Sequence, residues 1–405
     1  MIISEKIKKD FPIFSNNPDL AYLDSAASSQ TPEPVLQAML EYYTTYRANI
    51  HRGIYRESKL ATDEYAQARK EVAVFINADE KEIIFTGGAT ISSNMLAASL
   101  EHAGIVTHGD EIVASIMEHH ANFLPWQEFA SRRKAVFTTI PLRTNLFSID
   151  YAFAEKIITH KTKIVAVTLA SNVLGSINDI RRIADIAHSH GALLVCDATA
   201  AAGHIPIDVA LLDCDFLFFS GHKMCGPTGI GVLYGKKKHL ENLPPGFVGG
   251  GIVADVSSKH ARYLPPPERF ETGTPNISGA IGLGAACHYL SSIGVKTIHE
   301  HTQTMLAEAY ERLAKIPGIT IYAEKNPAKN VGIISFTMAS AHAHDVAQIL
   351  AEHRVAVRAG HHCAMPLGQA IGAPATTRAS FYLYNTREDV MLLTDALTEV
   401  KTIFG

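Results

Sequence analysis

The chain has 405 residues, of which 47% are hydrophobic and 19% charged, and its formal net charge is -4 at neutral pH. This composition is typical of a globular protein with a sizeable core, and the charge argues against nucleic acid or an anionic membrane as the main partner. Five irregularly spaced cysteines without a Cys-x-x-Cys pair predict neither a disulfide framework nor a zinc site, so we expect no metal.

The N-terminal part is predicted to begin without a targeting segment. It lacks the apolar core of a secretion signal, and no later stretch is long and apolar enough to span a bilayer, so we expect a cytoplasmic protein. Helical periodicity runs from Pro34 to Tyr46 and from about Ser58 to Asn77. Short strands are predicted at 21–24 and 83–85.

From residue 111 onward, apolar runs alternate with helical segments. The predicted strands are Glu111–Ile116, Ala135–Ile140, Lys163–Leu169, Ala192–Cys196 and Phe216–Phe219. Such alternation predicts a mainly parallel sheet covered by helices on both faces. Ligands of these sheets lie beyond the carboxyl ends of the strands, where this sequence repeatedly places polar residues.

The last third of the chain has a different pattern. Residues 235–280 are rich in proline and glycine, and so long a loop region is usually functional. A long helix is predicted from about Ile281, followed by strands at 318–322, 331–337 and 355–358. We therefore expect a large α/β domain over residues 20–285 and a smaller α+β domain formed by residues 1–19 with 286–405.

Lys223 lies at the mouth of the buried strand 216–219, in the run Ser220-Gly-His-Lys223. A lysine in such a place can have a depressed pKa, which makes its amine available to condense with an aldehyde. The run resembles the Schiff-base site of enzymes that use pyridoxal 5'-phosphate (PLP). An ordinary turn lysine explains these residues, taken alone, equally well.

Other residues could complete such a site. A carboxylate that keeps the pyridine nitrogen protonated could be Asp197, which otherwise reads as a helix N-cap. The turn Gly87-Gly-Ala-Thr90 before a helix could bind phosphate with Ser220 and His222, although such a turn is more often only a turn. His120 could stack on the ring, although a single histidine of this kind is usually a buried, hydrogen-bonded residue.

Two arginines and one cysteine are candidates for contacts with a substrate. Arg358 and Arg378 are suited to bidentate pairing with an amino-acid carboxylate. Between them, Cys363 follows a His-His pair in a glycine-containing loop, where cationic neighbours favour the thiolate. The other four cysteines lie in apolar or turn contexts. A nucleophilic cysteine beside a PLP site would narrow the chemistry sharply.

With these motifs in place, the chain from Phe11 to near its C-terminus resembles a cysteine desulfurase of the SUF (type II) subgroup, in the class V aminotransferase group of fold-type I PLP enzymes. The matching motifs are Ala21-Tyr-Leu-Asp-Ser-Ala-Ala27, His51-Arg-Gly53, Met117-Glu-His-His-Ala-Asn122, Ser171-Asn-Val-Leu-Gly175, Ser220-Gly-His-Lys223, Gly226-Pro-Thr-Gly-Ile-Gly231, Glu271-Thr-Gly-Thr-Pro-Asn276 and Arg358-Ala-Gly-His-His-Cys363. The resemblance implies a seven-stranded sheet in the large domain, and a small domain that carries the cysteine loop.

The resemblance also implies roles for residues at matching positions. Lys223 would bind the cofactor and move the Cα proton of L-cysteine, while Cys363 would attack the substrate sulfur and become a persulfide, leaving L-alanine. The sulfur would pass to an acceptor protein of the SUF system for iron–sulfur cluster assembly. The implied cofactor-contacting positions are Lys223, Asp197, His120, Thr90, Ala89, Asn172, Ala200, Ser220 and His222, with Thr274 from the other subunit of a homodimer. The implied substrate-binding residues are Arg378, Arg358, Asn172, His51 and Arg52, and the catalytic residues are Cys363, Lys223 and His120.

The sequence departs from the family pattern at a few positions. Ala200 replaces a glutamine that donates to the PLP phenolic oxygen, and Ala89 replaces a hydroxyl residue of the phosphate turn. Loss of one such hydrogen bond, worth ~0.5–1.5 kcal/mol, should weaken cofactor binding without abolishing it. Tyr55 stands where close relatives often have histidine. Two alternatives therefore stay open: a selenocysteine lyase or cysteine-sulfinate desulfinase, and a PLP-poor scaffold in sulfur transfer.

Overall fold

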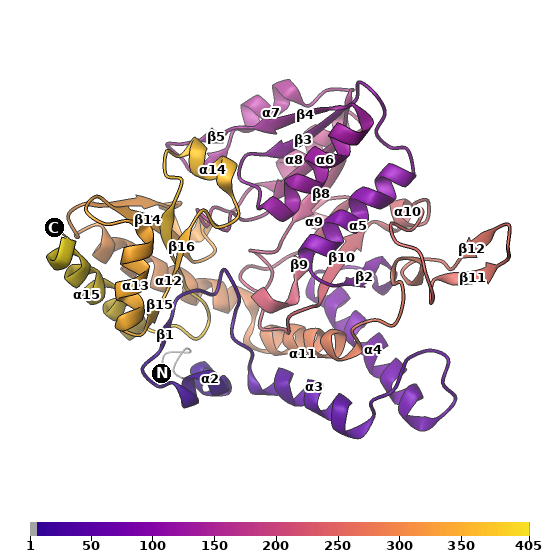
Figure 1. Cartoon of the computed structure of the whole chain (residues 1–405), viewed down its shortest axis with the longest axis horizontal. Helices are drawn as coiled ribbons and strands as arrows, with labels where there is room; N and C mark the ends of the chain where they lie inside the picture. Colours follow the sequence, from indigo (N-terminus) through magenta and orange to yellow (C-terminus); the bar gives the residue numbers. More distant parts are fainter. Residues whose placement is uncertain (1–5, 405) are drawn as a thin grey trace.

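Seven strands form the central sheet, in a computed structural model that describes residues 6–404 (Figure 1). Residues 1–5, which belong to the expected small domain, and residue 405 lie outside the described part. The strand order is β2 (Ile83–Thr86), β10 (Gly231–Gly235), β9 (Phe216–Ser220), β8 (Leu193–Asp197), β7 (Thr162–Thr168), β3 (Glu111–Ser115) and β4 (Val136–Ile140). Strand β10 runs antiparallel to both of its neighbours, and the pairs from β9 to β4 are parallel. The predicted mainly parallel sheet of seven strands is confirmed.

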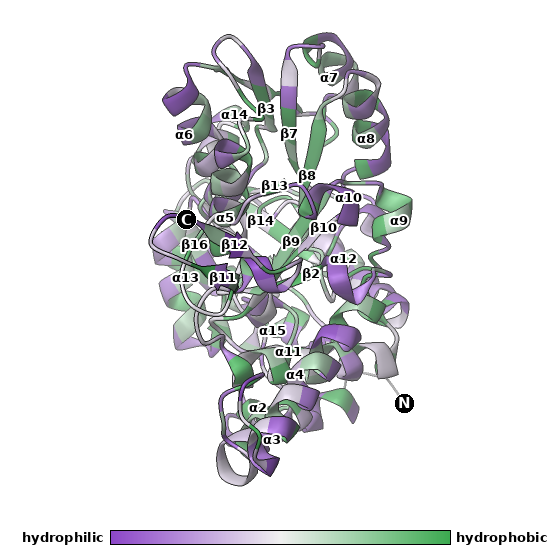
Figure 2. Cartoon of the chain, turned by 90° about the vertical axis from the view of Figure 1, so that its right-hand side faces the viewer, coloured by the Kyte–Doolittle hydropathy of each residue, from purple (hydrophilic) through white to green (hydrophobic). Residues whose placement is uncertain are grey.

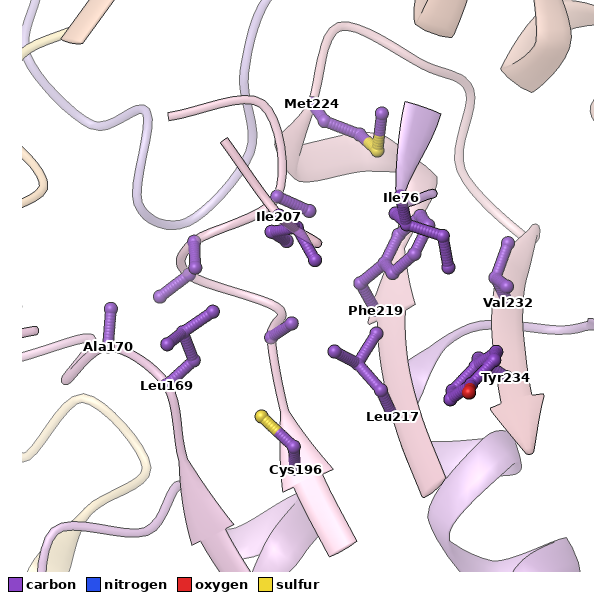
Figure 3. Packing of buried hydrophobic residues seen from close by; sticks show 14 of the residues in the cluster. Ile76, Leu169, Ala170, Cys196, Ile207, Leu217, Phe219, Met224, Val232 and Tyr234 are labelled. Carbon is purple, nitrogen blue, oxygen red and sulfur yellow. The ribbon is translucent and has the colours of Figure 1, made fainter. Parts of the chain in front are cut away.

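The strands alternate their side chains between two hydrophobic cores, one on each face of the sheet. In β9, Phe216 and Phe218 enter one core, whereas Leu217 and Phe219 enter the other, shown in Figure 3. Helices cover both faces: α5 (Ala89–His102) and α6 (Leu124–Arg133) pack on the first core, and α8 (Ile180–Ser189) packs on the second. In Figure 2, β7 and β8 are accordingly coloured mostly hydrophobic. Shorter helices in this part are α7 (Tyr151–Ile157), α9 (Val209–Leu212) and α10 (Lys237–Leu240).

Three long helices lie beside the sheet, at the bottom of Figure 1: α3 (Glu33–Thr45), α4 (Arg56–Phe75) and α11 (Ile277–Ile293). The single long helix predicted from about Ile281 is wrong in its extent. Helix α11 begins at Ile277 and ends where Gly294 adopts a φ of 91°, a left-handed conformation that glycine tolerates best. A second helix, α12 (Val295–Leu313), follows at once.

The C-terminal part forms a second, antiparallel sheet with its own hydrophobic core. Its strands, in order, are β13 (Ile319–Tyr322), β14 (Ile333–Met338), β17 (Thr376–Ser380) and β16 (Arg358–Gly360). Around it lie α12, α13 (Ala343–Glu352), α14 (Met365–Ala370) and α15 (Arg387–Phe404). The strand predicted over 355–358 is in fact two short strands, because β15 (Val355–Ala356) leaves this sheet to pair with β1 (Ala21–Tyr22). The start of the chain is thereby joined to its C-terminal part.

The remaining elements are short. They are α2 (Pro12–Asn16), β5 (Leu142–Arg143), β6 (Ser148–Ile149), β11 (Val253–Val256) and β12 (Ala261–Tyr263), with 3-10 turns that include η3 (His120–Asn122) and η4 (Gly221–Lys223). Strands β11 and β12 form a hairpin that projects from the body of the molecule at the right of Figure 1. Between residues 6 and 404, every helix is too short or too polar to traverse a lipid bilayer.

Candidate active site

A cavity of about 350 Å³ lies at the carboxyl ends of β7, β8 and β9, where ligands of such sheets bind. Most of the residues singled out in the sequence line it. They are Ala89, Thr90, Asn172, Asp197, Ala200, Ser220, His222, Lys223, Arg358, Cys363 and Arg378. The fold therefore gathers residues from six separate segments of the chain around one space. Four predicted residues are not part of this lining: His120, His51, Arg52 and Thr274.

Lys223 is presented by η4, the tight turn that directly follows β9. Desolvation, and second the nearby Arg378 guanidinium, lower the pKa of its amine to about 8. Part of the amine is therefore neutral near physiological pH, as the sequence predicted for a reactive lysine. Ser29 fixes the turn, because its Oγ donates to the His222 carbonyl at 3.1 Å and accepts from the Cys225 N–H at 2.7 Å.

Asp197 is the last residue of β8 and is buried. One of its oxygens accepts a hydrogen bond from the backbone N–H of Thr199, at 2.8 Å. Burial raises the pKa of the carboxyl, while the positive charge of Lys223 acts in the opposite direction. Such a carboxylate is stabilised by any cation, or any protonated ring nitrogen, that enters the cavity.

The start of α5 forms another part of the cavity wall. Gly88 caps this helix with a φ of 123°, a conformation that other residues rarely adopt, and a Cβ there would lie 3.4 Å from Ser220 Oγ. The Ala89 N–H donates to Ser220 Oγ at 2.8 Å. With Thr90 and His222 beside it, this helix start provides the donors and the dipole that bind phosphate.

The two adjacent histidines after β3 face different partners. His119 lines the cavity, and desolvation, followed by the charge of Lys223, lowers its pKa to about 3, so the ring is neutral. His120, to which the sequence assigned the ring-stacking position, instead contacts the cysteine loop: its Nε2 accepts from the Met365 N–H at 3.2 Å. The cavity wall is formed by His119 and not by His120, because His119 Nδ1 accepts from the Ala121 N–H, which starts a turn that directs the two side chains apart.

Arg358 and Arg378 converge on a single carboxylate, Asp24. Arg378 is 2% exposed. Its Nη1 donates to the Asn172 carbonyl at 2.8 Å, and its Nη2 donates to Asp24 Oδ1 at 3.3 Å. Arg358 pairs with the other Asp24 oxygen at 2.9 Å. Desolvation lowers the pKa of Arg378 to about 10, and its buried Nε has no hydrogen-bond partner within residues 6–404. A buried, unpaired donor is rare and indicates a ligand position.

Cys363 is the exposed cysteine among the five, and the other four are buried. Its backbone and that of His362 adopt φ values of 54° and 51°, and a non-glycine residue in this region costs ~1–2 kcal/mol. The loop is held in this shape by the surrounding protein: Asn172 Nδ2 donates to the His362 carbonyl at 2.8 Å, and His120 N–H donates to the Cys363 carbonyl at 2.7 Å. The strained loop thus presents the thiol at the cavity.

His51, Arg52 and Thr274 lie together in a second cavity of about 830 Å³, lined also by Glu268 and Glu271. The three residues therefore share one site, but within a single chain that site is separate from the one around Lys223. Glu271 is fixed there by a buried, bidentate ion pair with Arg69, at 2.6 and 2.8 Å.

The first cavity fits pyridoxal 5'-phosphate, the cofactor expected from the sequence. It offers an amine of lowered pKa, a buried carboxylate, a helix start with hydroxyl groups, and neutral His119 as a flat wall. Ala200 lies in the same wall and offers only a methyl group, as its sequence implied. The donor set is therefore complete for the aldehyde, the ring nitrogen and the phosphate, and lacks the side-chain donor that a glutamine would provide.

Sequence reasoning missed two residues of the site. Asp24 was noted only as part of a motif, although it joins the two arginines, and its partner Arg378 is 354 residues away in the chain. His119 was passed over for His120. No pattern in the sequence separates the two adjacent histidines, because the direction of each ring is set by the hydrogen-bonded turn at η3.

Comparison with known proteins shows the family to which the chain belongs. Residues 21–393 match the family model described as aminotransferase class-V. Curated relatives named probable cysteine desulfurase include one from Halalkalibacterium halodurans, 47% identical over 99% of both chains, and one from Staphylococcus epidermidis, 48% identical over 98% of this chain and 96% of the relative.

Solved structures point the same way. A cysteine desulfurase of Thermococcus onnurineus NA1 superposes with a TM-score of 0.94 at 42% identity, covering 99% of this chain and 98% of that one. A cysteine desulfurase of Escherichia coli superposes with a TM-score of 0.92 at 37% identity, covering 99% of each chain. These enzymes and their family depend on PLP. The chain belongs to the class-V aminotransferase family.

Proposed function

We propose that this protein is a PLP-dependent cysteine desulfurase, which converts L-cysteine to L-alanine and keeps the sulfur as a persulfide on Cys363. The observation that carries the proposal is that Lys223 and Cys363 line the same cavity, together with Asp197 and two arginines. A reactive amine, a ring-nitrogen partner, a carboxylate clamp and an accessible thiol serve one reaction together, and a scaffold would need none of them.

The residues assigned to the cofactor follow from the cavity wall. Lys223 would hold the aldehyde carbon, Asp197 the ring nitrogen, and Thr90, Ser220 and His222 with the start of α5 the phosphate. His119, rather than His120, would cover the ring face. When bound, the cofactor supplies an electron-withdrawing ring conjugated to the substrate nitrogen, which acidifies the substrate Cα–H.

The substrate carboxylate would bind Arg378, whose free Nε is a donor left over by the protein, with Arg358 and Asn172 beside it. Asp24 holds both arginine side chains in place, and its charge keeps the pair from repelling each other. Bidentate pairing of this kind fixes the orientation of the amino acid as well as its affinity.

Lys223 would move the proton. With its pKa lowered to about 8, roughly a tenth of the amine is unprotonated at pH 7, far more than for an ordinary lysine, and can accept the proton from the substrate Cα. The same Nζ can return a proton later, when alanine forms. Arg378 helps to keep the amine neutral, since it is the second cause of the lowered pKa.

Cys363 would act on the sulfur. Its thiolate attacks the substrate Sγ, a sulfur–sulfur bond forms, and the Cβ–Sγ bond breaks with its electron pair left on the carbon skeleton. Protonation of that carbon gives alanine, and the enzyme keeps Cys–S–SH, so atoms and electrons balance without an external oxidant. The exposed position of Cys363 would let a second protein collect the sulfur.

We further propose a homodimer in which His51, Arg52 and Thr274 complete the site of the partner subunit. The support is that these residues cluster in their own cavity, away from Lys223, and that apolar side chains flank its lining segments on the surface. Ile54, two residues after Arg52, is fully exposed, and Val248, two residues before the lining residue Gly250, is 67% exposed. Pairing would bury this surface.

The finer assignment is to the SUF (type II) subgroup, acting in the cytoplasm with an acceptor protein of the SUF system. The short loop from Arg358 to Cys363, packed against η3, supports this assignment. We also propose the division into a large domain, residues 20–285, and a small domain, residues 1–19 with 286–405. The separate hydrophobic core around β14 and β17 supports that division.

The test is alanine formation from L-cysteine, with PLP and a reductant, by the wild type and by Cys363→Ala. We expect alanine from the wild type, little or none from the variant, and a mass increase of one sulfur on Cys363 before reduction. Equal activity of both proteins would favour a lyase acting on selenocysteine or cysteine sulfinate, whose leaving groups need the thiol less. Absence of aldimine absorbance and of activity in both would favour the scaffold.

A further inference from the structure

His120 is a half-buried residue next to the active site, and the mechanism above does not use it. It follows His119 in η3, yet its ring does not line the cavity around Lys223. Its contacts run instead to the loop that carries Cys363. The ring centroids of His120 and His361 are 5.9 Å apart, and both hydrogen bonds that His120 makes outside its own turn end on that loop.

These two hydrogen bonds hold the backbone of the loop at Cys363 and at Met365. The His120 N–H donates to the Cys363 carbonyl at 2.7 Å, and the Met365 N–H donates to His120 Nε2 at 3.2 Å. On the other side of Cys363, Asn172 Nδ2 donates to the His362 carbonyl. The left-handed backbone of His362 and Cys363 is therefore held from both directions. Within the loop, the Ala364 N–H donates to the His361 carbonyl at 2.9 Å, and His120 adds the contacts that tie the C-terminal side of Cys363 to the large sheet.

The bond to Met365 also fixes the state of the imidazole. A backbone N–H can only donate, so Nε2 must be unprotonated and, in the neutral ring, the proton lies on Nδ1. Desolvation, and second the neighbouring His361, lower the pKa of His120, which favours this neutral form. The titratable groups beside the ring are His119 on its own turn and His361 and Cys363 on the loop.

We propose that His120 is a positioning residue that latches the Cys363 loop over the active site, through its backbone N–H and an Nε2 that accepts from Met365. The latch holds the thiol in reach of the substrate sulfur while it is closed. Protonation of Nε2 converts the acceptor to a donor that faces another donor, and opens the latch. This inference rests on the proposed role of Cys363, but the latch itself is a property of the loop.

The experiment uses the PLP-saturated protein and three variants. His120→Leu keeps the size of the side chain and removes the acceptor, whereas His120→Gln keeps an acceptor that does not titrate. Gln127→Ala, an exposed change on the following helix α6, is the matched control. Hydrogen exchange of the peptide spanning 358–367 reports on the loop, and kcat and KM for alanine formation report on catalysis.

We expect His120→Leu to speed exchange in 358–367 by about fivefold or more, because local protection follows the free energy of opening. Its kcat should fall about tenfold, with KM and the cofactor absorbance nearly unchanged, since the substrate and cofactor contacts remain. His120→Gln should restore both values at pH 8, and Gln127→Ala should match the wild type. Corrected for intrinsic rates, exchange should rise as the pH falls below about 6.5 in the wild type, because the pKa of His120 is lowered from that value, and stay flat in His120→Gln.

The proposal is overturned if His120→Leu exchanges like the wild type, whatever its activity. It is equally overturned if exchange increases while kcat stays unchanged, because the latch would then not position the thiol. If the wild type makes no alanine, the proposed function fails, and the exchange measurement still decides whether the latch exists.

Discussion

Strands β8 and β9 pair in parallel, and each end of this pair has a buried aspartate near a lysine: Asp215 directly precedes β9, and Asp197 is the last residue of β8. The two ends differ in how completely these charged groups are paired. At the N-terminal end, Asp215 is 2% exposed and its oxygens accept from His188 Nε2 at 2.8 Å, His239 Nε2 at 2.9 Å and the Leu194 N–H at 2.9 Å. Lys236 lies 3.3 Å away. These partners hold the pKa of Asp215 well below its usual range, although burial alone would raise it.

At the C-terminal end the aspartate and the lysine have fewer hydrogen-bond partners. Asp197 accepts from the backbone of Thr199, burial raises its pKa, and Lys223 Nζ makes no hydrogen bond within residues 6–404. The lysine is therefore left with a lowered pKa. The comparison teaches that the same residue types are structural where their hydrogen bonds are complete, and reserved for a ligand where they are not.

The largest contrast should appear when the two lysines are exchanged for alanine. Lys223→Ala removes the proposed proton carrier and should lower alanine formation by ~10²–10⁴-fold or more. Lys236→Ala, at the other end of β9, should leave the rate unchanged. Steady-state alanine formation at saturating L-cysteine measures both. Equal losses in the two variants would mean that Lys223 acts only through stability.

The aspartates should give the reverse contrast in stability. Asp215→Ala removes the acceptor of His188 and His239, whereas Lys236 keeps Asp213 at 2.6 Å. Because both histidines are partly exposed, we expect a loss of only about 1–3 kcal/mol in the free energy of unfolding. Asp197→Asn removes a carboxylate whose charge is disfavoured in the fold, so the PLP-free protein should change by less than about 1 kcal/mol, or become more stable, while activity is lost. Urea titrations decide this, and a large destabilisation by Asp197→Asn would contradict the comparison.

The two ends of the β8–β9 pair should also differ in how their buried carboxyl groups make the stability of the fold depend on pH. Glu118 is fully buried beside Asp197, and burial raises its pKa to about 8 even though Asn122 and the Thr168 N–H donate to it. A raised pKa means that its contribution is complete below about pH 4 and is lost as the pH rises toward 8. Asp215, with a lowered pKa, contributes above about pH 4 and loses its contribution at more acid pH.

Glu118→Gln should therefore flatten the decline of PLP-free stability between pH 5 and 8, by up to about 1.4 kcal/mol per pH unit for one proton. Asp215→Asn should instead flatten the loss below pH 4. Thermal denaturation across this range provides the measurement. An unchanged slope in Glu118→Gln would mean that the carboxylate stays ionised in the fold.

Much of this architecture could be predicted because short stretches of the sequence determine it. Wholly apolar runs such as 216–219 predict strands buried on both faces, and polar residues after them predict the edge where the cavity lies. The break at Gly294 was missed because a glycine inside a helical pattern does not reveal its φ. The pairing of β1 with β15 was missed because contacts between distant segments leave no periodic signal.

The sequence predicted which residue types gather at the site more reliably than it predicted where their side chains point. Lys223, Asp197 and Cys363 were expected in one place and line one cavity. The choice between His119 and His120 could not be made, because it depends on a turn that hydrogen bonds within η3 fix. The placement of His51, Arg52 and Thr274 in a separate cavity is likewise a property of the tertiary structure and not of their motifs.

The contact between Asp24 and Arg378 has a consequence for the making of the protein. The two residues are 354 positions apart, so at 5–20 residues per second the ribosome needs roughly 20–70 s to deliver the arginine after the aspartate. Until then, a nascent chain carries Lys223 and, near the end of this interval, Arg358 and Cys363, but it lacks the buried guanidinium of Arg378. The substrate-binding part of the site is therefore among the last parts of the protein to be made, and copies that end before Arg378 should not bind the amino-acid carboxylate properly.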